Sequence, residues 1–197
     1  MALGHRPGQA NRVRIIGGEL RGRRLAFPDV DGLRPTGDRI RETLFNWLQP
    51  VIAGARCLDL FAGSGALGFE AASRGAGRVV MLDADARVIA ALKANVSALG
   101  LDNVEVQRGA APAWLEGAAQ PFDVVFLDPP FGQGLLAPCC ALLESRGWLA
   151  PQARVYLEIS ARDDWPLLPK SWELLREQRA GRVRYGLARR RGDTLSP

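Results

Sequence analysis

The feature that most constrains the fold of this chain is a repeated alternation of short apolar runs with segments of helical periodicity. The apolar runs lie at 56–61, 78–83, 104–108, 122–128 and 153–160. Helices are predicted between them, from residue 65 to about residue 74, at 86–99, at 113–116 and at 135–145. Such apolar strands, joined by helices, are typical of a parallel sheet covered on both faces. Right-handed crossovers make such a sheet doubly wound.

The C-terminal part of the chain has a different pattern. Residues 172–179 and 182–190 alternate between apolar and polar side chains on either side of Gly181, which predicts an antiparallel hairpin. Five parallel strands and this hairpin would form a mostly parallel seven-stranded sheet in an α/β fold. Ligands of doubly wound sheets bind beyond the carboxyl ends of the strands, so chemistry is expected there.

About 50 residues precede the first core strand. Residues 1–11 are predicted to be disordered, and residues 12–27 predict two short strands joined by a turn at Gly17 and Gly18. We expect a small basic extension over 12–50, made of this hairpin and a helix, and a main domain over 51–191.

The helix of the extension is predicted to begin at Asp38, with either Thr36 or Gly37 as its cap. Apolar residues at 40, 44, 47 and 48 recur at helical spacing, which assigns Arg41 to the exposed surface. Asn95, in the helix predicted at 86–99, is likewise expected on a helix surface.

Arginine is concentrated at the two ends of the chain. Residues 1–24 contain six arginines and one acid, residues 176–197 contain seven arginines and two acids, and the segment between them is acidic. Basic ends favour a polyanionic partner such as a nucleic acid, because an arginine that neutralises a phosphate releases condensed counterions. The alternative is a solvated surface without a partner, which is the usual role of charged runs.

The composition excludes several classes of protein. The chain has one histidine, His5, and three cysteines, two of them adjacent, which disfavours a catalytic triad, a histidine-based metal site and a zinc site. No apolar run reaches the roughly 18 residues of a membrane span, and the N-terminus lacks the apolar block of a signal peptide. We therefore expect a soluble, cytoplasmic protein without a metal, and a monomer.

A glycine turn follows the first core strand. Gly63-Ser-Gly65-Ala-Leu-Gly68 matches the turn of nucleotide-binding folds, and Asp83 follows Gly63 by 20 residues, at the end of the second strand. An NAD-dependent oxidoreductase is one interpretation. Asp59, just before the turn, disfavours a pyrophosphate and favours a ligand with an ammonium or sulfonium group, as in S-adenosylmethionine. Alternatively, Asp59 accepts hydrogen bonds from the amides of the turn.

The fourth core strand ends in Asp128-Pro129-Pro130-Phe131. Two prolines make this segment stiff and leave its carbonyls without local donors. Asp128 and the carbonyl of Pro129 could accept the two N–H bonds of an exocyclic amine, and Phe131 could stack on the base that carries it. This arrangement favours methyl transfer to an amine, because positioning and electrostatics are most of what such a reaction requires. The alternative is a turn that only ends the strand.

These motifs together resemble a known group of enzymes. Residues 59–68, Asp83 and residues 128–131 are similar to class I S-adenosylmethionine-dependent methyltransferases that act on exocyclic amines. Residues 14–24 and 33–48 closely resemble the bacterial RsmD family, and the similarity continues to Arg190. That family methylates the N2 amine of a guanine in small-subunit (16S) ribosomal RNA.

The resemblance implies a role for each matching residue. The cofactor S-adenosylmethionine would contact Asp59, Phe61, Gly63, Gly65, Asp83, Ala110 and Thr36. The guanine would be held at the catalytic residues Asp128, Pro129, Pro130 and Phe131. RNA would be bound by Arg12, Arg14, Arg21, Arg23, Arg24, Arg34 and Arg39, so that 12–50 is an RNA-binding extension and 51–191 the methyltransferase domain. Ala110 departs from the pattern, because its side chain cannot accept a hydrogen bond from adenine.

The leading hypothesis is therefore guanine-N2 methylation of 16S ribosomal RNA, either as naked RNA or within an assembled small subunit. The target base must be looped or flipped out to reach the methyl donor. An adenine-N6 methyltransferase acting on DNA or RNA is the first alternative, since the same tetrapeptide suits both amines. The oxidoreductase leaves Asp128-Pro-Pro-Phe without a task, and a catalytically inactive RNA-binding module leaves both motifs unused.

Overall fold

The computed structural model describes residues 11–192. The strands are β1 (Asn11–Arg14), β2 (Arg24–Phe27), β3 (Arg56–Asp59), β4 (Arg78–Asp83), β5 (Val104–Arg108), β6 (Phe122–Leu127), β7 (Leu149–Ser160), β8 (Trp172–Ala180) and β9 (Val183–Arg190). The helices are α1 (Asp38–Leu48), α2 (Ala66–Ser73), α3 (Ala86–Leu99), α4 (Ala111–Trp114) and α5 (Leu136–Ser145). None of the described helices is long and apolar enough to cross a membrane.

A seven-stranded sheet forms the centre of the molecule, with its strands in the order β5-β4-β3-β6-β7-β9-β8. Neighbours from β5 to β7 are parallel, and β9 pairs antiparallel with both β7 and β8. The predicted doubly wound sheet with a C-terminal hairpin is thus confirmed. The direction of winding reverses between β3 and β6, and this is where such sheets bind ligands.

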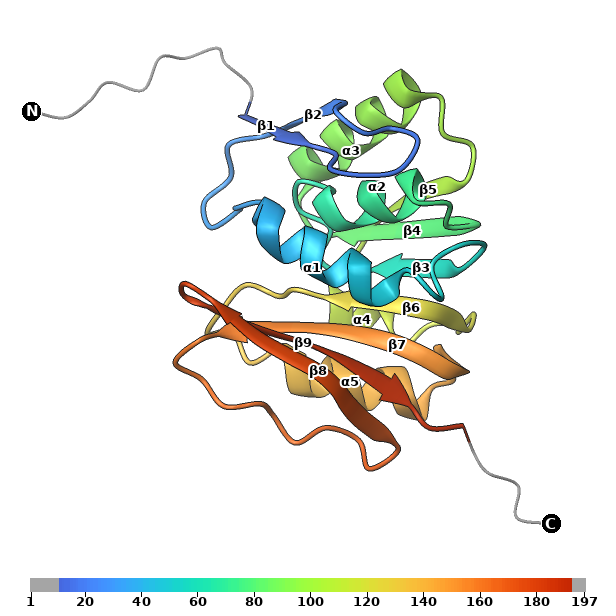
Figure 1. Cartoon of the computed structure of the whole chain (residues 1–197), viewed down its shortest axis with the longest axis vertical. Coiled ribbons are helices and arrows are strands. Elements are labelled where there is room, and N and C mark those ends of the chain that lie inside the picture. The colour runs from blue at the N-terminus through green and yellow to red at the C-terminus, as the bar shows by residue number, and fades with distance from the viewer. Residues whose placement is uncertain (1–10, 193–197) are drawn as a thin grey trace, which may run out of the picture.

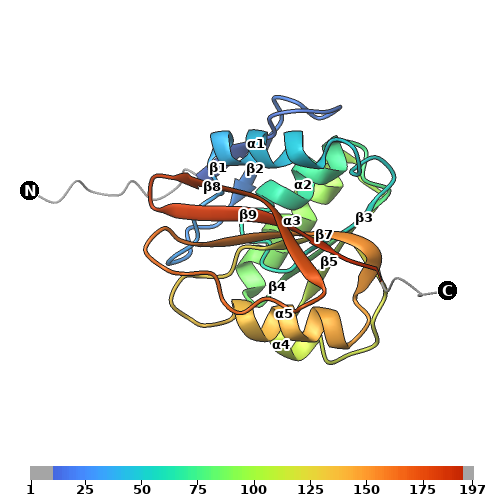
Figure 2. The same cartoon turned by 60° about the horizontal axis from the view of Figure 1, so that its bottom comes forward.

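Helices cover both faces of the sheet, so the molecule has three layers (Figures 1 and 2). The strands alternate between the two faces: Val124 and Phe126 of β6 pack with α1, α2 and α3, whereas Val125 and Leu127 pack with α4 and α5. Both sets are fully buried, which explains why the strands are almost wholly apolar.

Most predicted boundaries are close to the observed ones. Strand β4, helix α3 and strand β5 have the predicted limits, and Gly100 ends α3 with φ +64°. Strand β3 ends at Asp59, earlier than predicted, because the chain turns there into the glycine loop. Strand β7 begins at Leu149, four residues early, since Leu149 opposes Phe122 across a register irregularity in β6.

The N-terminal hairpin is present, but its connection is longer than predicted. Asn11 already belongs to β1, whereas residues 1–10 of the segment expected to be disordered lie outside the described residues. The strands are joined by residues 15–23, and Gly17 and Gly18 pack against the end of α2 instead of forming the turn. A Cβ on Gly18, which has φ +74°, would lie 1.8 Å from the carbonyl oxygen of Ser73. Docking onto α2 therefore explains these glycines.

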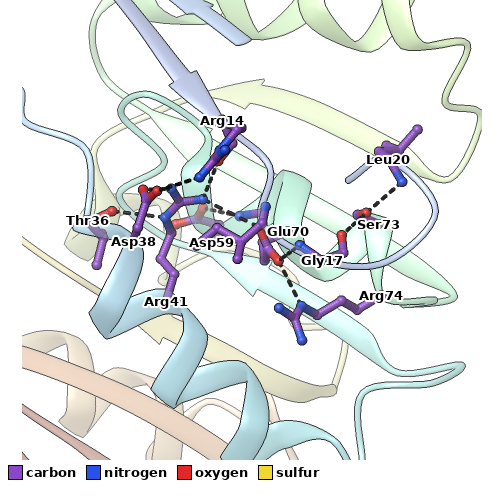
Figure 3. A network of polar contacts seen from close by, with 12 residues as sticks. Arg14, Gly17, Leu20, Thr36, Asp38, Arg41, Asp59, Glu70, Ser73 and Arg74 are labelled. Carbon is purple, nitrogen blue, oxygen red and sulfur yellow. Dashed lines mark hydrogen bonds and ion pairs between the residues drawn. The ribbon is translucent and has the colours of Figure 1, made fainter. Parts of the chain in front are cut away.

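Arg41 was expected on the surface and is instead 1% exposed. Its guanidinium donates to Asp38 Oδ1 at 2.6 Å and to Glu70 Oε2 at 3.4 Å, and also to the carbonyls of Arg14 and Thr36 (Figure 3). The prediction failed because Arg41 precedes the buried Leu44, Phe45 and Leu48 by three, four and seven positions, on the same helix face.

Glu70 of α2 is the partner that makes this burial tolerable. It is fully buried, and its two oxygens accept from the backbone amides of Ile16 and Gly17, each at 2.8 Å, and from Arg74 (Figure 3). The hairpin connection, α1 and α2 thus meet at one buried ion pair.

Asn95 was also expected on a helix surface and is buried, at 9% exposure. Its side-chain amide exchanges two hydrogen bonds with the backbone of Ala26 in β2. The packing of the hairpin over α3, visible in Figure 1, covers this position, and the helix periodicity alone could not reveal it.

Candidate active site

A cavity of about 1430 Å³ opens at the carboxyl ends of the strands. Its walls come from the loop after β2, the glycine loop after β3 and the ends of β4, β5, β6 and β7. Among the predicted site residues, it is lined by Arg34, Thr36, Asp59, Phe61, Gly63, Asp83, Ala110, Asp128, Pro129, Pro130 and Phe131. The structure therefore brings both sequence motifs to one cavity.

Asp83 is hydrogen-bonded to the glycine loop. One carboxylate oxygen accepts from the amide of Gly63 at 3.0 Å, and the other accepts from the amide of Asp85 at 2.9 Å. Each oxygen keeps a second lone pair, which could accept the hydroxyl of a ribose. Gly63 has φ +50°, so a residue with a side chain would be strained there.

The other two glycines of the motif serve packing. Gly65 does not line the cavity: it caps α2 with φ +76°, and a Cβ there would lie 2.6 Å from the ring of Phe69. A Cβ on Gly68 would lie 2.5 Å from Met81 Sδ, so this glycine allows α2 to lie close against β4. Gly68 thus sets the distance between α2 and the sheet, and Gly65 leaves room for Phe69 and for Leu92 of α3.

Asp59, at the end of β3, is 2% exposed and accepts a hydrogen bond from the amide of Gly68 at 3.0 Å. This contact is the structural alternative considered for it. Burial raises its pKa to about 7, and the nearby charges of Asp128 and Asp83 act in the same direction. A carboxylate in this position would be stabilised by a cationic ligand.

Asp128 lies directly beyond β6, on the side of the sheet that faces α1. Its Oδ2 accepts a hydrogen bond from the hydroxyl of Thr36 at 3.1 Å, so Thr36 contacts the tetrapeptide and not only the cofactor side of the cavity. The cap position of α1, left open between Thr36 and Gly37, is taken by Gly37. Burial raises the pKa of Asp128 above its ordinary value.

The rest of the tetrapeptide lines the cavity, and its residues become more exposed along the chain. Pro129 is buried, Pro130 is exposed, and Phe131 is 47% exposed although it is a large apolar residue. An exposed aromatic ring beside a buried acceptor is suited to stacking on a planar base.

Glu158 is a lining residue that the sequence reasoning missed. It is 5% exposed, and the hydroxyl of Tyr156 donates to its Oε2 at 2.6 Å. The available signal was an acid directly after the apolar run Val155-Tyr-Leu157 of β7. Arg162 and Arg182, from the segments that follow β7 and β8, also line the cavity.

The predicted RNA-binding arginines are all exposed, but they do not form one cluster at the cavity. Arg34 lines the cavity, whereas Arg12, Arg14, Arg21, Arg23, Arg24 and Arg39 lie outside its lining. Arg14 forms an ion pair with Asp38 at 3.5 Å, and both side chains remain more than half exposed.

The chain matches, over residues 13–189, the model of the family described as Conserved hypothetical protein 95. It is 48% identical to the ribosomal RNA small subunit methyltransferase D of Escherichia coli strain K12, over 92% of this chain and 91% of that protein. This chain belongs to the RsmD family of methyltransferases.

Further similarities agree with this membership. The protein of the same name from Haemophilus influenzae is 47% identical over 92% of this chain and 95% of its own length. The solved structure of the Escherichia coli protein yhhF, 47% identical, has a TM-score of 0.86 and covers 93% of this chain and 100% of that chain. The predicted class I methyltransferase fold is thereby confirmed, and the oxidoreductase and the inactive binding module are set aside.

The cavity of this RsmD-family enzyme suits a large cationic co-substrate. Asp59, Asp83 and Asp128 come from three neighbouring strands, and no ion pair within residues 11–192 neutralises Asp59 or Asp128. Ala110, beyond β5, offers no side-chain acceptor, so recognition of an adenine there would depend on backbone groups. No cluster of three or more metal-ligating side chains occurs in the described part of the chain.

Proposed function

We propose that this enzyme transfers a methyl group from S-adenosylmethionine to the N2 amine of a guanine in small-subunit ribosomal RNA. The observation that carries the proposal is the shared cavity of the glycine loop and Asp128-Pro-Pro-Phe, in a chain of the RsmD family. Adenine-N6 methylation is not favoured, because the curated relatives at 47–48% identity are named for small-subunit ribosomal RNA.

The cofactor side of the cavity would be formed by the first three strand ends. Asp59 and Phe61 would face the methionine part, Gly63 would allow close backbone approach, and Asp83 would accept from the ribose. Asp83 already accepts from the amide of Gly63, which supports the idea that one carboxylate orders the loop and binds the sugar together.

The amine would be held at the end of β6. Asp128 and the carbonyl of Pro129 would accept its two N–H bonds, and Phe131 would stack on the guanine ring. Accepting both protons directs the nitrogen lone pair out of the ring plane, toward the methyl group. S-adenosylmethionine supplies that methyl as an electrophilic carbon on a sulfonium, so the protein has to contribute positioning and charge.

The region 12–50 would serve as an RNA-binding extension of the methyltransferase domain at 51–191. Its seven exposed arginines support this assignment, since exposed arginines can bind phosphate bidentately. Only Arg34 lies at the cavity, so it would contact RNA nearest the target base.

The proposal is tested by incubating the protein with tritiated S-adenosylmethionine and one of three substrates, followed by nucleoside analysis. The substrates are naked 16S ribosomal RNA, assembled small subunits and duplex DNA. We expect label in N2-methylguanosine from one of the two RNA substrates. Label in N6-methyladenosine, or no label with either RNA, would refute the proposal.

A further inference from the structure

Two carboxyl groups of the cavity, the half-buried Asp128 and the buried Glu158, lie on neighbouring strands. Strands β6 and β7 are parallel and pair Leu127 with Leu157, so the next residues, Asp128 and Glu158, are neighbours across the two strands. Both line the cavity, and the charge of Asp128 acts on Glu158. The methyl-transfer mechanism outlined above uses Asp128 and leaves Glu158 without a role.

No cation compensates this pair. The groups that face it are the carboxyl group of Asp59 at the end of β3, the hydroxyl of Thr36 from the segment before α1, and the hydroxyls of Tyr156 on β7 and Tyr185 on β9. Arg34, Arg162 and Arg182 line the same cavity, but in the described part of the chain none of them forms an ion pair with Asp128 or Glu158. Tyr185 is directed elsewhere, since it donates to Gln178. Within residues 11–192, no ion pair includes either carboxyl group, and the buried Arg41 is bound to Asp38 and Glu70.

Two adjacent carboxyl groups that lack a cation cannot both be ionised at low cost, so they share a proton. Burial raises the pKa of both groups. The charge of Asp128 raises the pKa of Glu158 further, whereas a hydrogen bond from Glu158 and one from Thr36 lower the pKa of Asp128. Glu158 is also the more deeply buried of the two, at 5% exposure, whereas Asp128 is partly exposed and accepts a hydrogen bond from Thr36. A charge costs less on the more exposed group, so we assign the proton to Glu158 and the charge to Asp128.

We propose that Glu158, in its protonated form, is a positioning residue that donates a hydrogen bond to Asp128 and holds that carboxylate as the acceptor for the substrate amine. The inference rests on the proposed function for its substrate. Tyr156 orients Glu158 by donating to its Oε2, which leaves the other oxygen of Glu158 to carry the proton. Thr36 supplies a second donor to Asp128.

The arrangement also accounts for the proton that methylation releases. As the amine nitrogen bonds to the methyl carbon, the carbon–sulfur bond breaks and its electron pair stays on sulfur. The nitrogen then carries the positive charge and loses one proton to the ionised Asp128. Glu158 keeps its own proton throughout, so the pair is transiently doubly protonated and returns one proton to solvent when the product leaves.

The test compares Glu158→Gln with Glu158→Ala. A glutamine amide is permanently neutral, can donate to Asp128 and can accept from Tyr156, so Glu158→Gln is expected to retain kcat within about threefold. Glu158→Ala removes the donor and is expected to lower kcat by about 10- to 100-fold, with little change in the Kd of S-adenosylmethionine. Thermal unfolding of both variants checks that they are folded.

The pH dependence of kcat separates positioning from packing. Ionisation of Glu158 removes its donor hydrogen, so wild-type kcat should fall on the alkaline side, and Glu158→Gln should lose that alkaline limb. Its acid limb, which reports protonation of Asp128, should remain. A Glu158→Gln variant as impaired as Glu158→Ala, an alkaline limb that survives in Glu158→Gln, or an unimpaired Glu158→Ala would each overturn the inference.

A second measurement does not require activity. In protein with ¹³C-labelled carboxyl groups, the Glu158 signal of the free enzyme should remain that of a protonated acid at pH values where Asp128 has already ionised. Ionisation of Glu158 before Asp128 would overturn the inference even if ribosomal RNA is methylated. If instead the wild type methylates no RNA but the titration order is as expected, the proposed function fails while the state of the carboxyl pair stands.

Discussion

At the scale of single residues, the acids of the cavity are kept at a cost to stability. Asp59 has a pKa of about 7 in the folded chain, well above its ordinary value of 3.8, because it is buried. The folded state therefore binds this proton more tightly than the unfolded state does. The free energy of unfolding consequently falls as pH rises from about 4 to about 7, and the full penalty is present above that range.

Replacing Asp59 by asparagine should separate stability from binding. The asparagine carbonyl can still accept from Gly68, so Asp59→Asn should raise the free energy of unfolding at pH 8, by on the order of 2 kcal/mol, with a smaller gain at pH 5. The affinity for S-adenosylmethionine should fall, because the carboxylate is lost. Urea unfolding at the two pH values and calorimetric titration measure both effects. Equal destabilisation at both pH values would contradict this account.

Removing the carboxylate of Asp128 should affect turnover and leave the binding of the cofactor unchanged. Asp128→Ala is expected to lower turnover by about 100-fold or more while calorimetric binding of S-adenosylmethionine persists. Asp123→Ala is a matched control on the same strand, since Asp123 lies at the other end of β6, paired with Arg56. Loss of cofactor binding in Asp128→Ala would mean that Asp128 is structural.

The acids at the strand ends could be predicted from the sequence. The buried polar residues of the helices could not. Asp59, Asp83 and Asp128 follow apolar runs, and the rule for doubly wound sheets then places them together. Arg41, Glu70 and Asn95 are buried because segments distant in the sequence supply their partners, and no local pattern contains that information. Glu158 was detectable in principle, as an acid that follows a buried apolar run at the end of a strand.

At the scale of elements, the N-terminal hairpin is attached to helix α2 by polar contacts as well as by buried apolar residues. Glu70 accepts from the connection between β1 and β2, and Ser73 at the end of α2 bonds both Gly17 and Leu20.

The limits of strands and helices were well predicted where a glycine or a change of period marks them. The conformation of the hairpin connection was not predicted, because it depends on contacts with α2.

Breaking the buried ion pair should loosen this junction. Arg41→Met leaves Glu70 with Arg74 and two backbone amides, but it removes the buried guanidinium that joins Glu70 to Asp38 and to the carbonyls of Arg14 and Thr36. We expect the free energy of unfolding to fall by about 3 kcal/mol. Arg78→Ala is the control, because Arg78 pairs with Glu105 at the surface and should cost no more than about 1 kcal/mol. Urea unfolding of both variants gives the comparison. Similar decreases in the free energy of unfolding of the two variants would show that the buried Arg41 contributes no more to stability than a surface ion pair.

At the scale of the whole molecule, charge is divided between an acidic cavity and basic surroundings. The net charge of +5 combines arginine-rich ends with an acidic middle, and the described arginines of the hairpin are exposed. A methyl donor with a positive charge and an RNA with many negative charges would thus be attracted to different parts of one small protein.

The salt dependence of RNA binding should report the hairpin arginines. Arg23→Ala should lower the slope of log K against log salt by about 0.7 to 0.9, and replacing Arg21, Arg23 and Arg24 together should lower it by about 2. Arg146→Ala, which removes an exposed arginine at the end of α5 on the opposite face of the sheet, should leave the slope unchanged. Equal slopes for the wild type and the triple variant would remove the hairpin from the interface.

Helix α2 runs from the cavity to the connection between β1 and β2, so its length relates the two places. Its first residues, Ala66 and Leu67, line the cavity, while its last residue, Ser73, holds the hairpin connection. The helix has eight residues, or about 12 Å at 1.5 Å per residue. RNA that fills the cavity and also contacts the arginines of this connection, such as Arg21 or Arg23, would have to span a similar length, on the order of four stacked nucleotides.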